Sequence, residues 1–139
     1  MAEIVLGHDG SPGASAALGT AIALAGGLGD RLVVVYAAEP PNRLLGEEVG
    51  EHRNALEEIG AGVTKEAVMR AREAGVEAEP EIVHERPAAA LLAVAERRQA
   101  RLIVVGTSSE SPIAGAILGS VPHKLLHRSR IPVLVVPAP

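Results

Sequence analysis

Four short runs of aliphatic, mostly β-branched residues set the framework of this chain. They cover residues 4–6, 32–36, 102–105 and 133–136. Short runs that are apolar at every position are typical of strands buried on both faces of a parallel sheet. A weaker fifth candidate, residues 78–85, contains Pro80. Because proline cannot donate to a strand ladder, we expect that strand at a sheet edge.

Helical patterns fill the gaps between these runs. Ser11 and Pro12 suit the cap and first turn of a helix that Gly26 and Gly27 would end. A long helix is expected over residues 48–74, and a third over residues 88–98, opened by Pro87. The apolar stripe of the long helix is expected to contain Val49, His52, Leu56, Ile59, Val63 and Ala67.

The last helix is expected to start with Ser120 as its cap and to end near Arg128. Strands and helices then alternate along the whole chain. This alternation predicts an α/β fold, a doubly wound parallel sheet with helices on both faces, in a single domain over residues 1–139.

Composition narrows the possible functions. The formal net charge of −4 argues against a nucleic-acid surface, where a basic patch is expected. The sequence contains no cysteine, which excludes disulfides, thiolate metal sites and a cysteine nucleophile. No apolar stretch approaches the roughly 20 residues that span a bilayer, and the acidic start Met1-Ala2-Glu3 is unlike a signal peptide. We therefore expect a cytoplasmic protein without membrane or nucleic-acid partners.

Small and polar residues follow two of the expected strands. Residues 7–11 (GHDGS) come directly after the first strand, and residues 106–109 (GTSS) follow the fourth, with Gly119-Ser120-Val121 at the next helix start. Ligands of doubly wound sheets bind beyond the carboxyl ends of the strands, where small residues let backbone amides approach a phosphate. The alternative is that both segments are simply tight strand-to-helix turns.

Four segments, residues 9–11, 102–107, 118–121 and 132–136, resemble the universal stress protein family in order and spacing. The resemblance covers the whole chain. Its most specific part is the glycine motif G-x2-G-x9-G-[ST] of members that bind ATP, which places Gly106 first, Ser109 second, and then Gly119 and Ser120.

The resemblance implies a sheet order of 3-2-1-4-5 and a pocket for ATP or AMP. Asp9 would contact the adenosine, Ala37 would line the base pocket, and the two later segments would hold the phosphates. The implied nucleotide-binding residues are Asp9, Ala37, Val105, Gly106, Ser108, Ser109, Gly119, Ser120 and Val121. It also implies a homodimer through the last strand.

The sequence departs from the motif where phosphates would lie. Ser109 replaces the middle glycine, and its Cβ narrows the approach and disfavours a positive φ. Ser108 stands where the family often has a basic residue, and Glu110 adds a carboxylate nearby. Serine hydroxyls can still donate hydrogen bonds, so these changes predict a weakened phosphate site rather than none.

Other motifs give weaker indications. Neither a P-loop nor a G-x-G-x-x-G turn is present. His123 and His127 have a spacing that allows shared metal binding, but Lys124 and Arg128 beside them favour a solvated helix face. His8 is read as lining the cleft. No base and metal carboxylates accompany it, so we expect a binding module without catalytic residues, and regard a slow nucleotide hydrolase as the least favoured alternative.

The last expected strand, residues 133–136, would present an apolar, unpaired edge bracketed by Pro132 and Pro137. Such an edge favours one short antiparallel pairing with a second copy about a two-fold axis. The alternatives are that the flanking prolines protect the edge of a monomer, and that the same fold acts as a dimeric interaction protein that binds no nucleotide.

Overall fold

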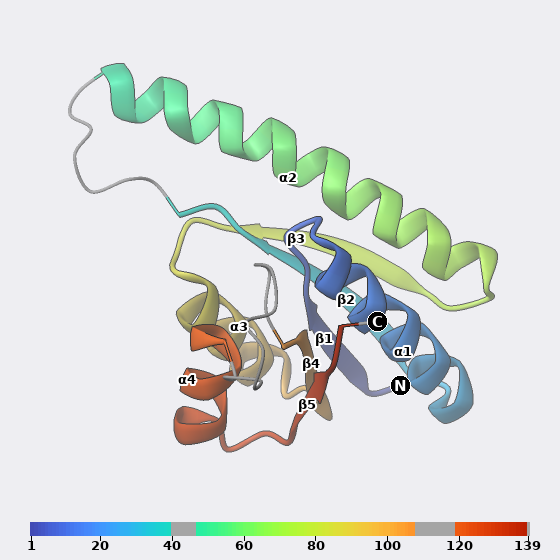
Figure 1. The fold of residues 1–139 in the computed structure, drawn as a ribbon. Helices are drawn as coiled ribbons and strands as arrows, with labels where there is room; N and C mark the ends of the chain where they lie inside the picture. Colours follow the sequence, from blue (N-terminus) through green and yellow to red (C-terminus); the bar gives the residue numbers. More distant parts are fainter. Residues whose placement is uncertain (40–46, 108–118, 139) are drawn as a thin grey trace.

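The computed structural model describes residues 1–39, 47–107 and 119–138 (Figure 1). Strands and helices alternate along the chain as expected. In chain order they are β1 (Glu3–Gly7), α1 (Pro12–Leu28), β2 (Arg31–Ala37), α2 (Glu47–Glu73), β3 (Ala78–Val83), α3 (Pro87–Arg98), β4 (Leu102–Gly106), α4 (Ser120–Arg128) and β5 (Val133–Val136).

All strand pairings in the sheet are parallel, and the strand order β3-β2-β1-β4-β5 confirms the expected α/β topology. The central strand β1 pairs with β2 on one side and β4 on the other. The strand that contains Pro80 lies at one edge, as its missing N–H group requires. The first and fourth strands are therefore neighbours, and their carboxyl ends lie side by side.

Helices cover both faces of the sheet, with α1 and α2 on one face and α3 and α4 on the other (Figure 1). Alternate residues of each strand point to opposite faces and build two separate cores. Ile4 and Leu6 of β1 pack with α1 and α2, whereas Val5 packs with α3. Both cores are almost entirely aliphatic. Within the part of the chain that the structure describes, no helix is both long and apolar enough to cross a membrane.

Two helix ends differ from the sequence expectation. Ser11 does cap α1, because its Oγ accepts a hydrogen bond from the N–H of Ala14 at 3.2 Å. The helix continues through Gly26 and Gly27, however, and ends at Leu28, with Gly29 as its C-cap in a left-handed conformation (φ of 70°). At α4, the cap is Gly119 and Ser120 is the first helical residue.

The buried face of α2 also differs from the expected stripe. Ile59 is 54% exposed, and the neighbouring Gly60 is buried instead. A Cβ on Gly60 would lie 2.5 Å from Cδ1 of Tyr36, so the aromatic ring occupies the space that a side chain would need. α2 therefore turns Gly60, and not Ile59, toward the ring of Tyr36. Hydrophobic spacing alone could not reveal this, because glycine carries no apolar signal.

Candidate functional site

A cavity of about 350 Å³ opens at the carboxyl ends of the strands, between the turn after β1, the start of α3 and the start of α4. Seven of the residues proposed from the sequence line it: Asp9, Ala37, Val105, Gly106, Gly119, Ser120 and Val121. The other two, Ser108 and Ser109, lie outside the described residues, as does Glu110. The fold therefore brings together segments that are about 110 residues apart in sequence at one end of a parallel sheet.

The turn between β1 and α1 holds Asp9 at the cavity wall. Its Oδ1 accepts a hydrogen bond from the N–H of Ser11 at 2.9 Å. Gly10 has a φ of 84°, a left-handed conformation that glycine adopts without strain. The backbone N–H of His8 still bonds to the carbonyl of Val35, so the turn starts from a fixed strand end. The carboxylate of Asp9 is consequently oriented before any ligand arrives.

Gly106 lets α1 approach the end of β4 closely. A Cβ at this position would lie 2.7 Å from the carbonyl oxygen of Gly13, a backbone atom that cannot rotate away. The first glycine of the motif therefore has a packing role in this structure. It allows the first turn of α1 to pack directly against the end of β4, beside the cavity.

The start of α4 supplies hydrogen-bond donors. The first-turn N–H groups of Ser120 and Val121 have no acceptor within their own helix, while Pro122 has no N–H group. No side chain in the described part of the chain caps this end. The N–H of Gly119 is held by the carbonyl of Thr107 at 2.9 Å, which fixes the helix start beside β4. Helix starts of this kind bind anions such as phosphate.

The buried imidazole of His8 contacts the turn between β1 and α1. Its Nδ1 accepts a hydrogen bond from the N–H of Gly10 at 3.0 Å, so the neutral ring carries its proton on Nε2. Burial lowers the pKa of His8, and the charge of Arg70 acts in the same direction, whereas Asp9 and Glu66 oppose them. His8 is therefore a neutral, structural part of the turn at neutral pH.

Sequence reasoning missed the α3 side of the cavity. Pro87 and Leu91 of α3 line the cavity. Thr107, which follows β4, also lines it. Pro87 was interpreted only as a helix start, because the side of α3 that faces the cavity depends on how the helix packs against β1 and β2. Only the position of Pro87 after the edge strand could have suggested that α3 starts beside the ligand.

The two histidines of α4 lie away from the cavity. The rings of His123 and His127 meet edge to face with centroids 4.5 Å apart, and both residues are exposed. Among the described residues, no group of three or more potential ligands could hold a metal ion. The pair belongs to a solvated face of α4, next to Lys124 and Arg128.

The fold and the position of its cavity define a doubly wound α/β protein with a cavity at the switch in strand order between β1 and β4, where ligands of such folds bind. Residues 1–137 match the Universal stress protein family. A universal stress protein of Thermus aquaticus is 34% identical over 137 residues, which are 96% of each chain. The chain therefore belongs to the universal stress protein family.

Solved structures agree with this assignment. A family member from Burkholderia pseudomallei is 34% identical, with a TM-score of 0.82 over 99% of this chain and 96% of that one. A universal stress protein solved in complex with cAMP is 30% identical, with a TM-score of 0.78 over 99% and 98% of the two chains.

Proposed function

We propose that this protein is a binding module for adenine nucleotides in the stress response, with the cavity between β1, β4 and α4 as its site. The observation that carries the proposal is the convergence around one cavity of an oriented carboxylate, Asp9, and the first N–H groups of α4, which no side chain of the described residues caps. The similar structure that holds cAMP supports an adenine nucleotide as the ligand.

Each wall of the cavity has a distinct role in this proposal. Ala37, Pro87 and Leu91 give an apolar wall against which a flat base can pack. Asp9 accepts hydrogen bonds from ribose hydroxyls. The N–H groups of Ser120 and Val121 donate to a phosphate, assisted by the helix dipole. Ser108 and Ser109 remain proposed phosphate contacts on the basis of the family motif.

We propose binding without turnover. Within the described cavity wall, the titratable residues are Asp9 and His8, and His8 is buried and engaged by Gly10. A general base needs a free, correctly placed acceptor. The competing function, an interaction protein with the same fold and no nucleotide, is favoured only by the departures at Ser109 and Glu110. Nucleotide binding distinguishes the two.

The test is calorimetric titration of AMP into the wild-type protein and into Asp9→Ala. The proposal predicts binding by the wild type and an affinity about ten- to a hundredfold lower in the variant, the usual effect of losing a hydrogen bond to a charged group. Asp9→Asn is the matched control, because an amide oxygen can keep the bond to the N–H of Ser11. Absence of binding by the wild type would favour the interaction protein.

We further propose that the protein forms a homodimer through β5. The carbonyls of Pro132 and Val136 accept hydrogen bonds from β4, so the backbone groups of Val133 and Val135 point toward the free edge. An antiparallel two-fold pairing then matches Val133 with the partner's Val135. Ile131 ends the pairing, because its N–H and carbonyl are both bonded to the hydroxyl of Ser129.

Light scattering during size-exclusion chromatography measures the mass and so tests the proposed dimer through β5. The wild type should elute at about twice the chain mass of 14.3 kDa. Val135→Pro removes an outward-facing donor but no bond to β4, so the variant should be a folded monomer. Wild-type protein at the monomer mass would refute the dimer.

A further inference from the structure

The proposed binding mode leaves one titratable residue of the described cavity wall, His8, without a role. Its side chain lines the cavity, yet the residue is only 8% exposed. Its backbone N–H donates to the carbonyl of Val35 at 2.9 Å, which holds His8 at the end of the sheet. Any movement of the turn between β1 and α1 must therefore take place beyond His8, at Asp9 and Gly10.

Two overlapping side-chain hydrogen bonds shape this turn. Nδ1 of His8 accepts from the N–H of Gly10 at 3.0 Å. Oδ1 of Asp9 accepts from the N–H of Ser11 at 2.9 Å. Each bond joins a side chain to the backbone two residues later, as asparagine and aspartate side chains do in tight turns. The bond to His8 fixes the peptide group between Asp9 and Gly10, so it also helps to fix where the carboxylate of Asp9 points.

The bond between His8 and Gly10 exists only while Nδ1 of His8 is unprotonated. A protonated imidazole would turn an N–H group toward the N–H of Gly10, donor against donor. A flip of the ring would not restore the bond, because an imidazolium has no acceptor nitrogen. Since the backbone of His8 is held by Val35, the displacement falls on the peptide next to the carboxylate of Asp9.

Charged groups from two elements act on this imidazole. Asp9 lies in the same turn, and Glu66 and Arg70 belong to α2. Burial lowers the pKa of His8 and Arg70 acts in the same direction, whereas Asp9 and Glu66 oppose them. Tyr36 of β2 is neutral at neutral pH, because burial and the charge of Asp9 raise its pKa. The bond to Gly10 is therefore intact at neutral pH and is lost in acid.

Building on the proposed function, we infer that His8 is a positioning residue, which orients Asp9 for the ligand only while its imidazole is neutral. In the neutral form, the turn holds the carboxylate of Asp9 at the cavity wall. In the protonated form the turn rearranges, and the ligand loses its well-placed acceptor. Protonation of His8 and ligand binding therefore oppose each other, and acid weakens binding.

The test is calorimetric titration of AMP into the wild type and into His8→Asn at several pH values from about 8 to about 5.5. The asparagine oxygen can accept from the N–H of Gly10 but does not titrate. The phosphate of AMP also titrates in this range, but it does so equally for both proteins. We expect the wild type to lose about three- to tenfold in affinity relative to the variant as the pH falls.

The other outcomes separate this inference from the function on which it rests. If both proteins depend equally on pH, or if the wild type binds relatively more tightly in acid, His8 does not control Asp9, although the cavity still binds AMP. Absence of AMP binding by both proteins at neutral pH would refute the proposed function itself.

A second variant separates positioning from packing. His8→Ala removes the acceptor at every pH, so it should bind AMP about fivefold more weakly than His8→Asn at neutral pH, the usual effect of one lost hydrogen bond. Urea denaturation shows whether each variant folds, and if the alanine variant does not, the pH comparison decides alone. Equal affinities of two folded variants would show that the bond to Gly10 does not position Asp9.

Discussion

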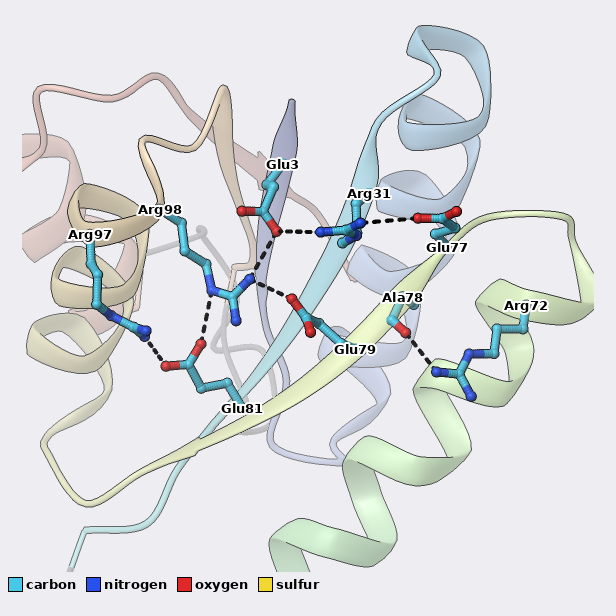
Figure 2. Close-up of polar contacts among 9 residues, drawn as sticks. All are labelled: Glu3, Arg31, Arg72, Glu77, Ala78, Glu79, Glu81, Arg97 and Arg98. Carbon is cyan, nitrogen blue, oxygen red and sulfur yellow. Dashed lines mark hydrogen bonds and ion pairs between the residues drawn. The ribbon is translucent and has the colours of Figure 1, made fainter. Parts of the chain in front are cut away.

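The two ends of the parallel sheet have opposite chemistry. At the carboxyl ends of the strands, the described part of the cavity wall is built mostly from small and apolar residues, with Asp9 as its one carboxylate. At the amino ends, arginines and carboxylates from several elements pair with one another (Figure 2). One end therefore leaves backbone donors and a carboxylate available to a ligand, whereas the other satisfies its charges internally and serves stability.

Arg98 is the centre of the charged end. This last residue of α3 contacts Glu3 of β1 at 2.9 Å and Glu81 of β3 at 3.0 Å, and it also bonds to Glu79 (Figure 2). Burial alone would lower the pKa of Arg98, but Glu79 and Glu3 more than offset it and raise the pKa. The residue thus ties α3 to two strands that do not touch each other.

The same end also protects the edge of β3. The carbonyls of Glu77 and Val83 bond to β2, so those of Ala78, Pro80 and Ile82 face outward. Arg72 donates to the carbonyl of Ala78 at 3.1 Å, and Pro80 removes a donor from the edge (Figure 2). Of the two sheet edges, β5 is therefore the one suited to pairing with a second copy.

The largest effect is expected where α1 packs against the end of β4, beside the cavity. Gly106→Ala would force its new Cβ against the carbonyl of Gly13, and we expect a loss of about 2 kcal/mol or more in the free energy of unfolding. Gly19→Ala is the control, because nothing lies within 4 Å of a Cβ in the middle of α1. It should stabilise the protein by roughly 0.5–1 kcal/mol. Urea denaturation at one fixed protein concentration measures both, and equal effects would contradict the packing role of Gly106.

A smaller loss is expected at the charged end. Arg98→Met keeps the apolar stem but leaves three carboxylates without their shared partner, which should cost about 1–2 kcal/mol. Arg97→Met is the comparison, because Arg97 is 59% exposed while Arg98 is 19% exposed, and exposed pairs contribute less than about 1 kcal/mol. Neither variant should change the affinity for AMP. A change in affinity would show that the two ends are coupled.

The comparison also shows what the sequence could predict. The aliphatic runs were sufficient to predict where the strands lie in the sequence. Pro80 was sufficient to predict that β3 is an edge strand. Both predictions follow from local residue chemistry. The charged end was not foreseen. Glu3, Glu79 and Arg98 are far apart in sequence, and only strand order and helix packing bring them together.

The cavity was foreseen only in part, because helix packing places some of its wall residues and local sequence places the others. Asp9, Gly106 and Gly119 follow or precede strands and helices whose ends must meet. The family motif includes the two glycines, and the wider resemblance to the family implied Asp9. Leu91 was missed because its place depends on the rotation of α3. The burial of Gly60 beside Tyr36 was also missed, because a glycine adds nothing to an apolar stripe.

The smallest expected effect is a dependence of the free energy of unfolding on pH, caused by the buried His8 in the turn between β1 and α1. Burial lowers the pKa of His8 below its ordinary value of 6.5, so the unfolded chain binds a proton that the folded protein resists. Stability should therefore fall as the pH drops below 6.5. His8→Asn, whose side-chain oxygen can accept from Gly10, should flatten this dependence between neutral pH and the folded pKa. Urea denaturation at several pH values measures the free energy of unfolding of both proteins. If it depends on pH as steeply in the variant as in the wild type, His8 is not the source of the dependence.

The most direct test of the account is a nitrogen–proton NMR titration of the labelled protein with AMP. We predict that the amide signals of Gly10, Gly106, Ser120 and Val121 shift together and saturate, while those of Glu3, Glu77 and Glu79 at the other end stay in place. Shifts largest at the charged end, or no saturable shift at the start of α4, would contradict the assignment of this cavity as a nucleotide site.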